Sequence, residues 1–320
     1  MTTILIALKE SNVPEELQKR AQEICPDARI VVTDDKQEIE PLLDEIEIAA
    51  GHFPIQWIPR ANRLRWYQQW GAGTDWLMRH PEVRALDFQL TNASGVHAIP
   101  ISEHIFAFML AFARRLPEAM RAQTQRQWNR QEDSPAFELA GKTMLLVGVG
   151  AIGRQTAHMA AALGMRVTGV RSDPAKTVPG VDRMVGPQEM LAALPEADFV
   201  VLTMPLTDET RGIVNHAFIE QMKPSAYLIN IGRGGTVDED ALIEALLTGK
   251  IAGAGLDVFA VEPLPATSPL WEMPNVIITG HYSGETPHYN ERALAIFIDN
   301  LERYANGRPL RNLVDKKRGY

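Results

Sequence analysis

The stretch KTMLLVGVGAIGRQTAHMAAALGMRVTGVRS, residues 142–172, decides the fold of this chain. Its apolar run over 142–148 predicts a strand, 152–163 predicts an amphipathic helix, and 166–170 predicts a second strand. Strand, helix and strand in this order form the unit from which parallel sheets are built. The stretch therefore predicts an α/β fold with a parallel sheet.

Three glycines stand where the first of these strands passes into the helix. Gly148, Gly150 and Gly153 form the pattern G-x-G-x-x-G. In this context the first glycine permits a tight turn, the second lets the backbone approach a pyrophosphate, and the third lets the helix pack closely on the strand. The free N–H groups at the helix start, including those of Ala151 and Ile152, would face the phosphates. The pattern predicts a dinucleotide site, and a glycine-rich turn without a ligand is the alternative.

The same alternation of apolar runs and helical patterns continues on both sides. Towards the C-terminus we expect strands over 198–203, 226–231, 252–259 and 275–279, and helices over 189–194, 238–247 and 285–306. Towards the N-terminus we expect strands over 4–8, 29–33, 45–51, 65–71 and 88–94, and helices over 15–24, 37–43 and 75–78. Between the halves we expect a long helical stretch over 98–131, part of which Ser102 could cap, followed by a polar loop from Gln131 to Pro135. The pattern predicts two doubly wound parallel-sheet domains.

The composition of the chain indicates which kinds of molecule it binds. The chain has 320 residues, of which 45% are hydrophobic, and a formal net charge of -8. An acidic surface argues against nucleic acid or an anionic membrane as the main partner, so we expect a small-molecule partner. The single cysteine, Cys25, excludes an internal disulfide, and the histidines lack metal-ligand spacing, so we expect no metal. No apolar stretch approaches the length of a membrane span, and we expect a cytoplasmic protein.

The end of the second strand bears on the choice of nucleotide. An NAD site usually has Asp or Glu there, which accepts hydrogen bonds from the ribose hydroxyls. This chain has Arg171 and Ser172 instead, with Asp173 expected to point away. A guanidinium cannot accept those bonds but can pair with a 2′-phosphate. We therefore expect NADP rather than NAD, and the alternative is an Arg171 that faces solvent while NAD is held in another way.

Three further polar residues follow predicted strands. Arg233 lies in NIGRGG, Glu262 in LDVFAVEPLP and His281 in VIITGHYSGETP. Because ligands of open α/β sheets bind beyond the carboxyl ends of the strands, we expect all three at one rim. Reduction of a 2-keto acid needs a carboxylate clamp, which Arg233 can supply, and a proton, which His281 can supply. Glu262 can hold the imidazole in place. Taken singly, each is as readily a capping or surface residue.

Here the sequence resembles the D-isomer-specific 2-hydroxyacid dehydrogenases, a family that includes glyoxylate and hydroxypyruvate reductases. The resemblance runs over nearly the whole chain and includes GAGTD (71–75), SGVHAIPISEH (94–104), GVGAIG (148–153), MPLTDETRGIVN (204–215), NIGRGG (230–235), GLDVFAVEPLP (255–265), GHYSGETP (280–287) and NLVD (312–315). It implies a Rossmann coenzyme domain, residues 99–285, inserted into a flavodoxin-like substrate domain, residues 1–98 and 286–320. It also implies a homodimer that pairs through the coenzyme domain.

The resemblance assigns further roles. The backbone amides of Ala72 and Gly73 would hold the substrate carboxylate beside Arg233. Asp257 would bind the nicotinamide carboxamide. Further coenzyme contacts are expected from Thr203, Met204, Pro205, Ile231 and His281.

Two questions stay open at this point. Tyr282, in a segment that departs from the family pattern, would either line the substrate pocket or pack against the nucleotide. Glyoxylate and hydroxypyruvate are the first choices of substrate, with pyruvate, phenylpyruvate or a branched 2-keto acid as alternatives. A nucleotide-sensing, corepressor-like binding protein on the same fold is the alternative to an enzyme.

Overall fold

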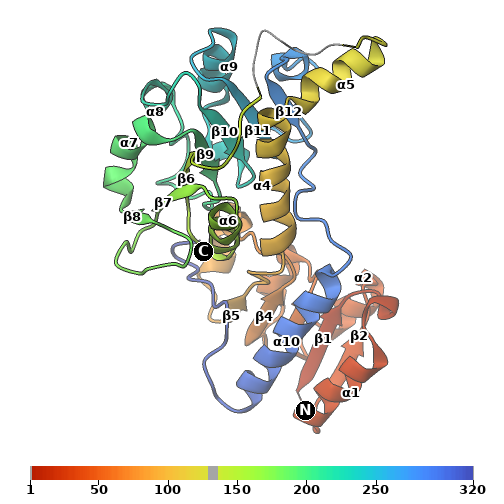
Figure 1. Ribbon diagram of the computed structural model, residues 1–320. Coiled ribbons are helices and arrows are strands. Elements are labelled where there is room, and N and C mark those ends of the chain that lie inside the picture. The colour runs from red at the N-terminus through yellow and green to blue at the C-terminus, as the bar shows by residue number, and fades with distance from the viewer. Residues whose placement is uncertain (1, 129–135, 320) are drawn as a thin grey trace. The chain divides into compact units, whose positions relative to one another are not determined.

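Figure 1 shows the computed structural model of the chain, which describes residues 2–128 and 136–319. The predicted polar loop from Gln131 to Pro135 lies outside these residues. The chain divides into two compact units: unit 1 comprises Met1–Val96 and Thr286–Tyr320, and unit 2 comprises His97–Glu285. Within the described ranges, no helix is long and apolar enough to span a membrane.

Unit 1 is built on a five-stranded parallel sheet. Its strands are β1 (Thr3–Ala7), β2 (Arg29–Val32), β3 (Ile46–Gly51), β4 (Trp66–Gln69) and β5 (Gln89–Thr91). Its α-helices are α1 (Glu15–Ile24), α2 (Lys36–Ile39), α3 (Pro81–Arg84) and α10 (Tyr289–Ala305). The strand order β2-β1-β3-β4-β5 is the flavodoxin-like order. Successive strands are added on one side of β1 and then on the other, so the topological switch point lies between β1 and β3.

Helices cover both faces of this sheet. Ile4 and Ile6 of β1 pack with Phe297 of α10 on one face, whereas Leu5 and Ala7 belong to the cluster on the other face. Because side chains alternate along a strand, a strand that is buried on both faces is expected to be mostly apolar, and β1 is apolar from Ile4 to Ala7. Helices α1 and α10 lie side by side over one face (Figure 1).

Unit 2 has a seven-stranded parallel sheet. Its strands are β6 (Thr143–Val147), β7 (Arg166–Val170), β8 (Arg183–Val185), β9 (Phe199–Leu202), β10 (Tyr227–Asn230), β11 (Gly253–Leu256) and β12 (Val276–Ile278). Its α-helices are α4 (Ala98–Ala113), α5 (Leu116–Thr124), α6 (Ala151–Ala162), α7 (Met190–Ala193), α8 (His216–Glu220) and α9 (Glu239–Leu247). The order β12-β11-β10-β9-β6-β7-β8 is the Rossmann order with one added strand. Its topological switch point, where successive strands begin to be added on the other side, lies between β6 and β9.

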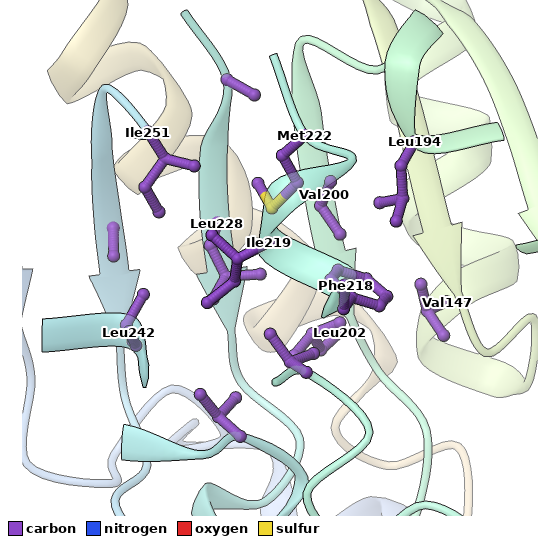
Figure 2. Packing of buried hydrophobic residues seen from close by; sticks show 14 of the residues in the cluster. Val147, Leu194, Val200, Leu202, Phe218, Ile219, Met222, Leu228, Leu242 and Ile251 are labelled. Atoms are coloured by element: carbon purple, nitrogen blue, oxygen red, sulfur yellow. The ribbon is translucent and has the colours of Figure 1, made fainter. Parts of the chain in front are cut away.

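Two apolar clusters lie on opposite faces of the unit 2 sheet. Helices α4 and α6 pack on one face. On the other face, Phe218 and Ile219 of α8 lie over Val200, Leu202 and Leu228 of the central strands (Figure 2). The sheet is thus fixed from both sides, which holds the ends of its strands in a defined position.

The helical stretch expected over 98–131 is divided into two helices. Helix α4 ends at Ala113 and α5 begins at Leu116. Between them Arg115 adopts a left-handed φ of 60°, which interrupts helical geometry. Pro117 lacks the N–H that a continuous helix would need, but it is tolerated in the first turn of a new one.

Other local expectations also differ from the structure. Ser102 is not a cap: it is fully buried inside α4, and its hydroxyl lies 3.0 Å from that of Thr156. The segment 75–78 forms a 3-10 helix (Asp75–Arg79), and 37–43 splits into α2 and a 3-10 turn around Pro41. Strand β8 and helices α3 and α8 are too short to show a clear hydrophobic period and were not predicted.

Candidate active site

The predicted polar residues follow neighbouring strands of the unit 2 sheet. Arg233 comes after β10, Glu262 after β11 and His281 after β12. These strands pair in parallel, side by side, so their carboxyl ends lie at the same edge. The glycine pattern after β6 lies at this edge too, one strand beyond β9.

His281 and Glu262 form a hydrogen-bonded pair. The Nδ1 atom of His281 lies 2.7 Å from Oε2 of Glu262. The other carboxylate oxygen of Glu262 accepts the backbone N–H of Phe259 at 2.9 Å, which fixes the carboxylate. The His281 side chain is 47% exposed, so its ring is open to a ligand. With Nδ1 held by the carboxylate, Nε2 is the atom that remains for proton transfer.

The loop of Arg233 is fixed by buried polar groups. The side chain of Asn230 accepts the N–H of Gly232 at 3.1 Å and donates to the carbonyl of Arg233 at 3.2 Å. The hydroxyl of Thr236 donates to the same carbonyl at 2.6 Å. Because Asn230 and Thr236 are both buried, these bonds hold the arginine backbone in place.

Gly234 brings the arginine loop against the Glu262 loop. A Cβ atom on Gly234 would collide with the backbone of Phe259 and Ala260. Only a glycine permits this approach. The loops after β10 and β11 therefore pack backbone to backbone, and this places Arg233 beside the segment that leads to Glu262.

The glycine pattern fits a dinucleotide. Gly148 has a φ of 101°, and a Cβ there would lie 2.7 Å from the backbone nitrogen of Met204. Gly153 allows no Cβ either, because the atom would collide with the carbonyl of Gly148. Gly150, the N-cap of α6, instead faces open space, with nothing within 4 Å of an added Cβ. Two glycines thus serve packing, and the third leaves room for a phosphate at the helix start.

The residues expected beside the coenzyme differ in their burial. The hydroxyl of Thr203 donates to the carbonyl of Gly148, so it belongs to the turn itself. Met204 and Ile231 are buried, whereas Pro205 is exposed. Ala151 and Ile152, in the first turn of α6, are half-buried.

The end of β7 carries a cation. The backbone N–H of Arg171 donates to Val185 of β8 at 3.1 Å, which anchors the strand end. The Arg171 side chain is half-buried, and within the described ranges no ion pair of its guanidinium occurs. Ser172 is exposed beside it. The carboxylate of Asp173 pairs with the ammonium of Lys176 at 3.4 Å and not with Arg171.

Asp257 faces the His281 loop. It is fully buried, and its carboxylate accepts hydrogen bonds from the hydroxyl of Thr279 at 2.6 Å and from the N–H groups of Tyr282 and Ser283, each at 3.1 Å. Burial alone would raise the pKa of Asp257, but these hydrogen bonds lower it overall, so the carboxylate stays ionised. The Tyr282 side chain is 48% exposed.

In unit 1, the backbone of Ala72 and Gly73 presents two N–H groups. The carbonyl of Ala72 accepts a hydrogen bond from Asn92 at 2.9 Å, and the carbonyl of Gly73 accepts one from Gln69. Gln69 is fixed in turn by Trp76, whose indole N–H donates to it at 2.6 Å. Within residues 2–128 and 136–319 the N–H groups of Ala72 and Gly73 donate no hydrogen bond. Backbone N–H groups in such a turn can bind an anion.

Sequence reasoning missed the residues that hold these loops. Asn230 and Asn92 are buried amides at strand ends, and their positions were the available signal. Among the described residues there is no group of three or more His, Cys, Asp or Glu side chains that could hold a metal ion.

Comparisons with known proteins agree with this geometry. The family model for the NAD binding domain of D-isomer specific 2-hydroxyacid dehydrogenases matches residues 106–283. Glyoxylate/hydroxypyruvate reductase B of Pectobacterium carotovorum is 38% identical over 220 residues, which are 67% of this chain and 68% of that protein. D-3-phosphoglycerate dehydrogenase of Methanocaldococcus jannaschii is 34% identical over 81% of this chain, but the match covers only 49% of that longer protein.

A solved structure matches over the full length. It is an NADPH-dependent glyoxylate/hydroxypyruvate reductase from Sinorhizobium meliloti, determined in complex with NADP and sulfate. It is 28% identical, the match covers 100% of both chains, and the TM-score is 0.83.

Proposed function

Since the chain belongs to the D-isomer specific 2-hydroxyacid dehydrogenase family, we propose that it reduces a small 2-keto acid to the D-2-hydroxy acid with NADPH. It is an NAD(P)-dependent oxidoreductase with a Rossmann coenzyme domain. The similarity supports this activity over a corepressor-like binding role. Glyoxylate and hydroxypyruvate are the proposed substrates, because relatives over most or all of the chain carry those names.

The observation that carries the proposal is the 2.7 Å hydrogen bond between His281 and Glu262, next to the Arg233 loop and on the same sheet edge as the glycine pattern. When bound, the nicotinamide supplies the hydride. His281, held by Glu262, donates a proton from Nε2 to the developing alkoxide oxygen. Arg233 binds the substrate carboxylate and stabilises negative charge on that oxygen.

Further roles complete the proposal. The N–H groups of Ala72 and Gly73 bind the substrate carboxylate, and Tyr282 lines the substrate side of the His281 loop. Coenzyme contacts come from Gly148, Gly150, Ala151, Ile152, Gly153, Arg171, Ser172, Thr203, Met204, Pro205, Ile231 and His281. Asp257 is proposed to bind the nicotinamide carboxamide, and its carboxylate also holds the loop through Thr279, Tyr282 and Ser283.

We also propose which unit binds the coenzyme and which binds the substrate. We propose residues 99–285 as the coenzyme domain, and 1–98 with 286–320 as the substrate domain. A homodimer that pairs through the coenzyme domain and a cytoplasmic location are also proposed. Analytical ultracentrifugation tests the dimer, and fractionation of cells tests the location.

A steady-state panel of 2-keto acids with NADPH and NADH tests the activity. We expect turnover with glyoxylate or hydroxypyruvate, and a loss of ~10²–10⁴-fold in His281→Gln, as is typical for removal of a general acid. The matched control is His80→Gln. His80 also forms a histidine–glutamate pair, with its Nδ1 atom 2.9 Å from Glu82, but it lies elsewhere in the chain. Normal turnover in purified His281→Gln would exclude the assignment.

A further inference from the structure

The loop that carries His281 has an unfavourable backbone conformation. His281 adopts a φ of 58°, in the left-handed region that side chains other than glycine rarely occupy. Such a conformation persists only where the surroundings hold it. Asp257 holds the loop by accepting hydrogen bonds from the N–H groups of Tyr282 and Ser283. A second set of contacts comes from helix α4.

Two histidines of the α4 region contact the loop on either side of His281. The Nδ1 atom of His97, the N-cap of α4, lies 3.0 Å from the carbonyl oxygen of Gly284. The Nε2 atom of His104 lies 3.0 Å from the hydroxyl of Thr279. The two histidines are seven residues apart (104 − 97), which is about two helical turns and places them on one face.

The hydrogen bonds define the tautomer of each ring. The hydroxyl of Thr279 gives its only proton to Asp257, so it must accept one from Nε2 of His104. The carbonyl of Gly284 can only accept, so Nδ1 of His97 is the donor. Both rings therefore act as donors to the loop.

Packing fits this arrangement. The His104 ring lies edge-on between Phe108, at a centroid distance of 4.6 Å, and Tyr282, at 5.7 Å. Burial lowers the pKa of His104, and the nearby Asp257 carboxylate offsets only part of this effect. The hydrogen bond to Thr279 requires an N–H on Nε2, and a neutral ring can supply it. At the other end, a Cβ on Gly284 would lie 3.0 Å from the His97 ring, so glycine is needed there for close contact.

We propose that His97 and His104 are positioning residues, which hold the loop on α4 at both sides of His281 and so fix the direction of its imidazole. This rests on the proposed function of His281 as proton donor. Neither histidine needs to touch substrate or coenzyme. Thr279 and the carbonyl of Gly284 are the points at which they act.

Matched substitutions separate the hydrogen bond from the mere presence of a side chain. Gln at position 104 keeps an N–H near the place of Nε2, and Asn at position 97 keeps one near the place of Nδ1, whereas Leu keeps neither. We expect His104→Leu and His97→Leu each to lower kcat roughly tenfold, as loss of one such bond implies. KM and the dissociation constant of NADPH should change little, and His104→Gln and His97→Asn should restore most of kcat.

A double-mutant cycle tests whether His104 acts through His281. If it does, His104→Leu should have no further effect on the residual rate of His281→Gln. An equal fall of rate in both backgrounds would overturn the proposal, as would full kcat in both Leu variants. The proposed function fails separately, if His281→Gln itself keeps its turnover.

Hydrogen exchange gives a readout without substrate. The N–H groups of Tyr282 and Ser283 are bonded to Asp257, and peptides that cover 279–285 should exchange faster in the Leu variants than in the native protein. Thr279→Val, which removes the acceptor hydroxyl, should have the same effect and serves if a Leu variant does not fold. Native exchange rates in Thr279→Val and both Leu variants would contradict the proposal.

Discussion

Replacement of Arg171 should change the preference between the two coenzymes. Its guanidinium lies at the end of β7, and the neighbouring carboxylate of Asp173 is paired with Lys176 at 3.4 Å. A 2′-phosphate brings nearly two negative charges and three acceptor oxygens to that point. Arg171→Ala removes the cation, and Arg171→Asp places a like charge against the phosphate.

The expected magnitude follows from the exposure of the side chain. A charge-assisted hydrogen bond is worth roughly 1.5–3 kcal/mol. Because Arg171 is only half-buried, solvent screens part of this energy, and we expect the lower end, about tenfold in affinity. Arg171→Ala should thus lower kcat/KM with NADPH about tenfold and leave kcat/KM with NADH unchanged. Arg171→Asp should reverse the preference.

The assay measures kcat/KM with both coenzymes at one fixed salt concentration, and the dissociation constant of each coenzyme by fluorescence. Arg183→Ala is the matched control, because Arg183 is an exposed arginine at the opposite, amino end of the adjoining strand. The preference for NADPH should weaken as salt rises, since exposed charges are screened. A native enzyme that prefers NADH, or an unchanged ratio in Arg171→Asp, would refute the reasoning.

Three other changes test the site and the fold. Arg233→Lys keeps the charge but loses the planar fork, so KM should rise and kcat should fall together in steady-state assays; an unchanged KM would argue against a carboxylate clamp. Gly153→Ala forces a Cβ against the carbonyl of Gly148, so thermal melts should show a loss of ~1–3 kcal/mol and titrations a weaker coenzyme complex. Burial alone would raise the pKa of Asp198, but the backbone N–H that it accepts and the Lys223 ammonium, 3.0 Å away, lower it overall. Its stabilising effect is therefore present above the unfolded-state pKa of about 3.9 and is lost as the pH falls through the folded-state value. Asp198→Asn should lower the melting temperature at neutral pH, by an amount that shrinks towards zero in acid; a difference independent of pH would contradict this.

The sequence was informative where a single local rule decides the structure. Gly148, Gly150 and Gly153 predicted a strand, a turn and a helix, because few other structures need glycine at that spacing. The strand ends at Arg233 and His281 were predicted for a similar reason, since a short apolar run that stops at a polar residue marks the edge of a parallel sheet.

Long-range contacts were not available from the sequence. The helical stretch expected over 98–131 did not show its break at Arg115, for which Pro117 was the one local signal. The hydroxyl of Ser102 bonds to Thr156 of another helix, so its role depends on a partner 54 residues away. The same holds for His104, whose link to Thr279 spans 175 residues.

The composition of unit 1 from two separate segments affects how the chain is made. Helix α10 supplies Phe297, which stacks on Trp66 of the first sheet at a centroid distance of 5.6 Å. A ribosome delivers residues 97–285 before that helix, at about 5–20 residues per second. The part of this face that α10 covers therefore waits on the order of ten seconds or more for its helix, while α1 is already present to cover the rest. During this interval apolar surface of unit 1 stays exposed, which favours aggregation, while the continuous segment that forms unit 2 can complete its own core.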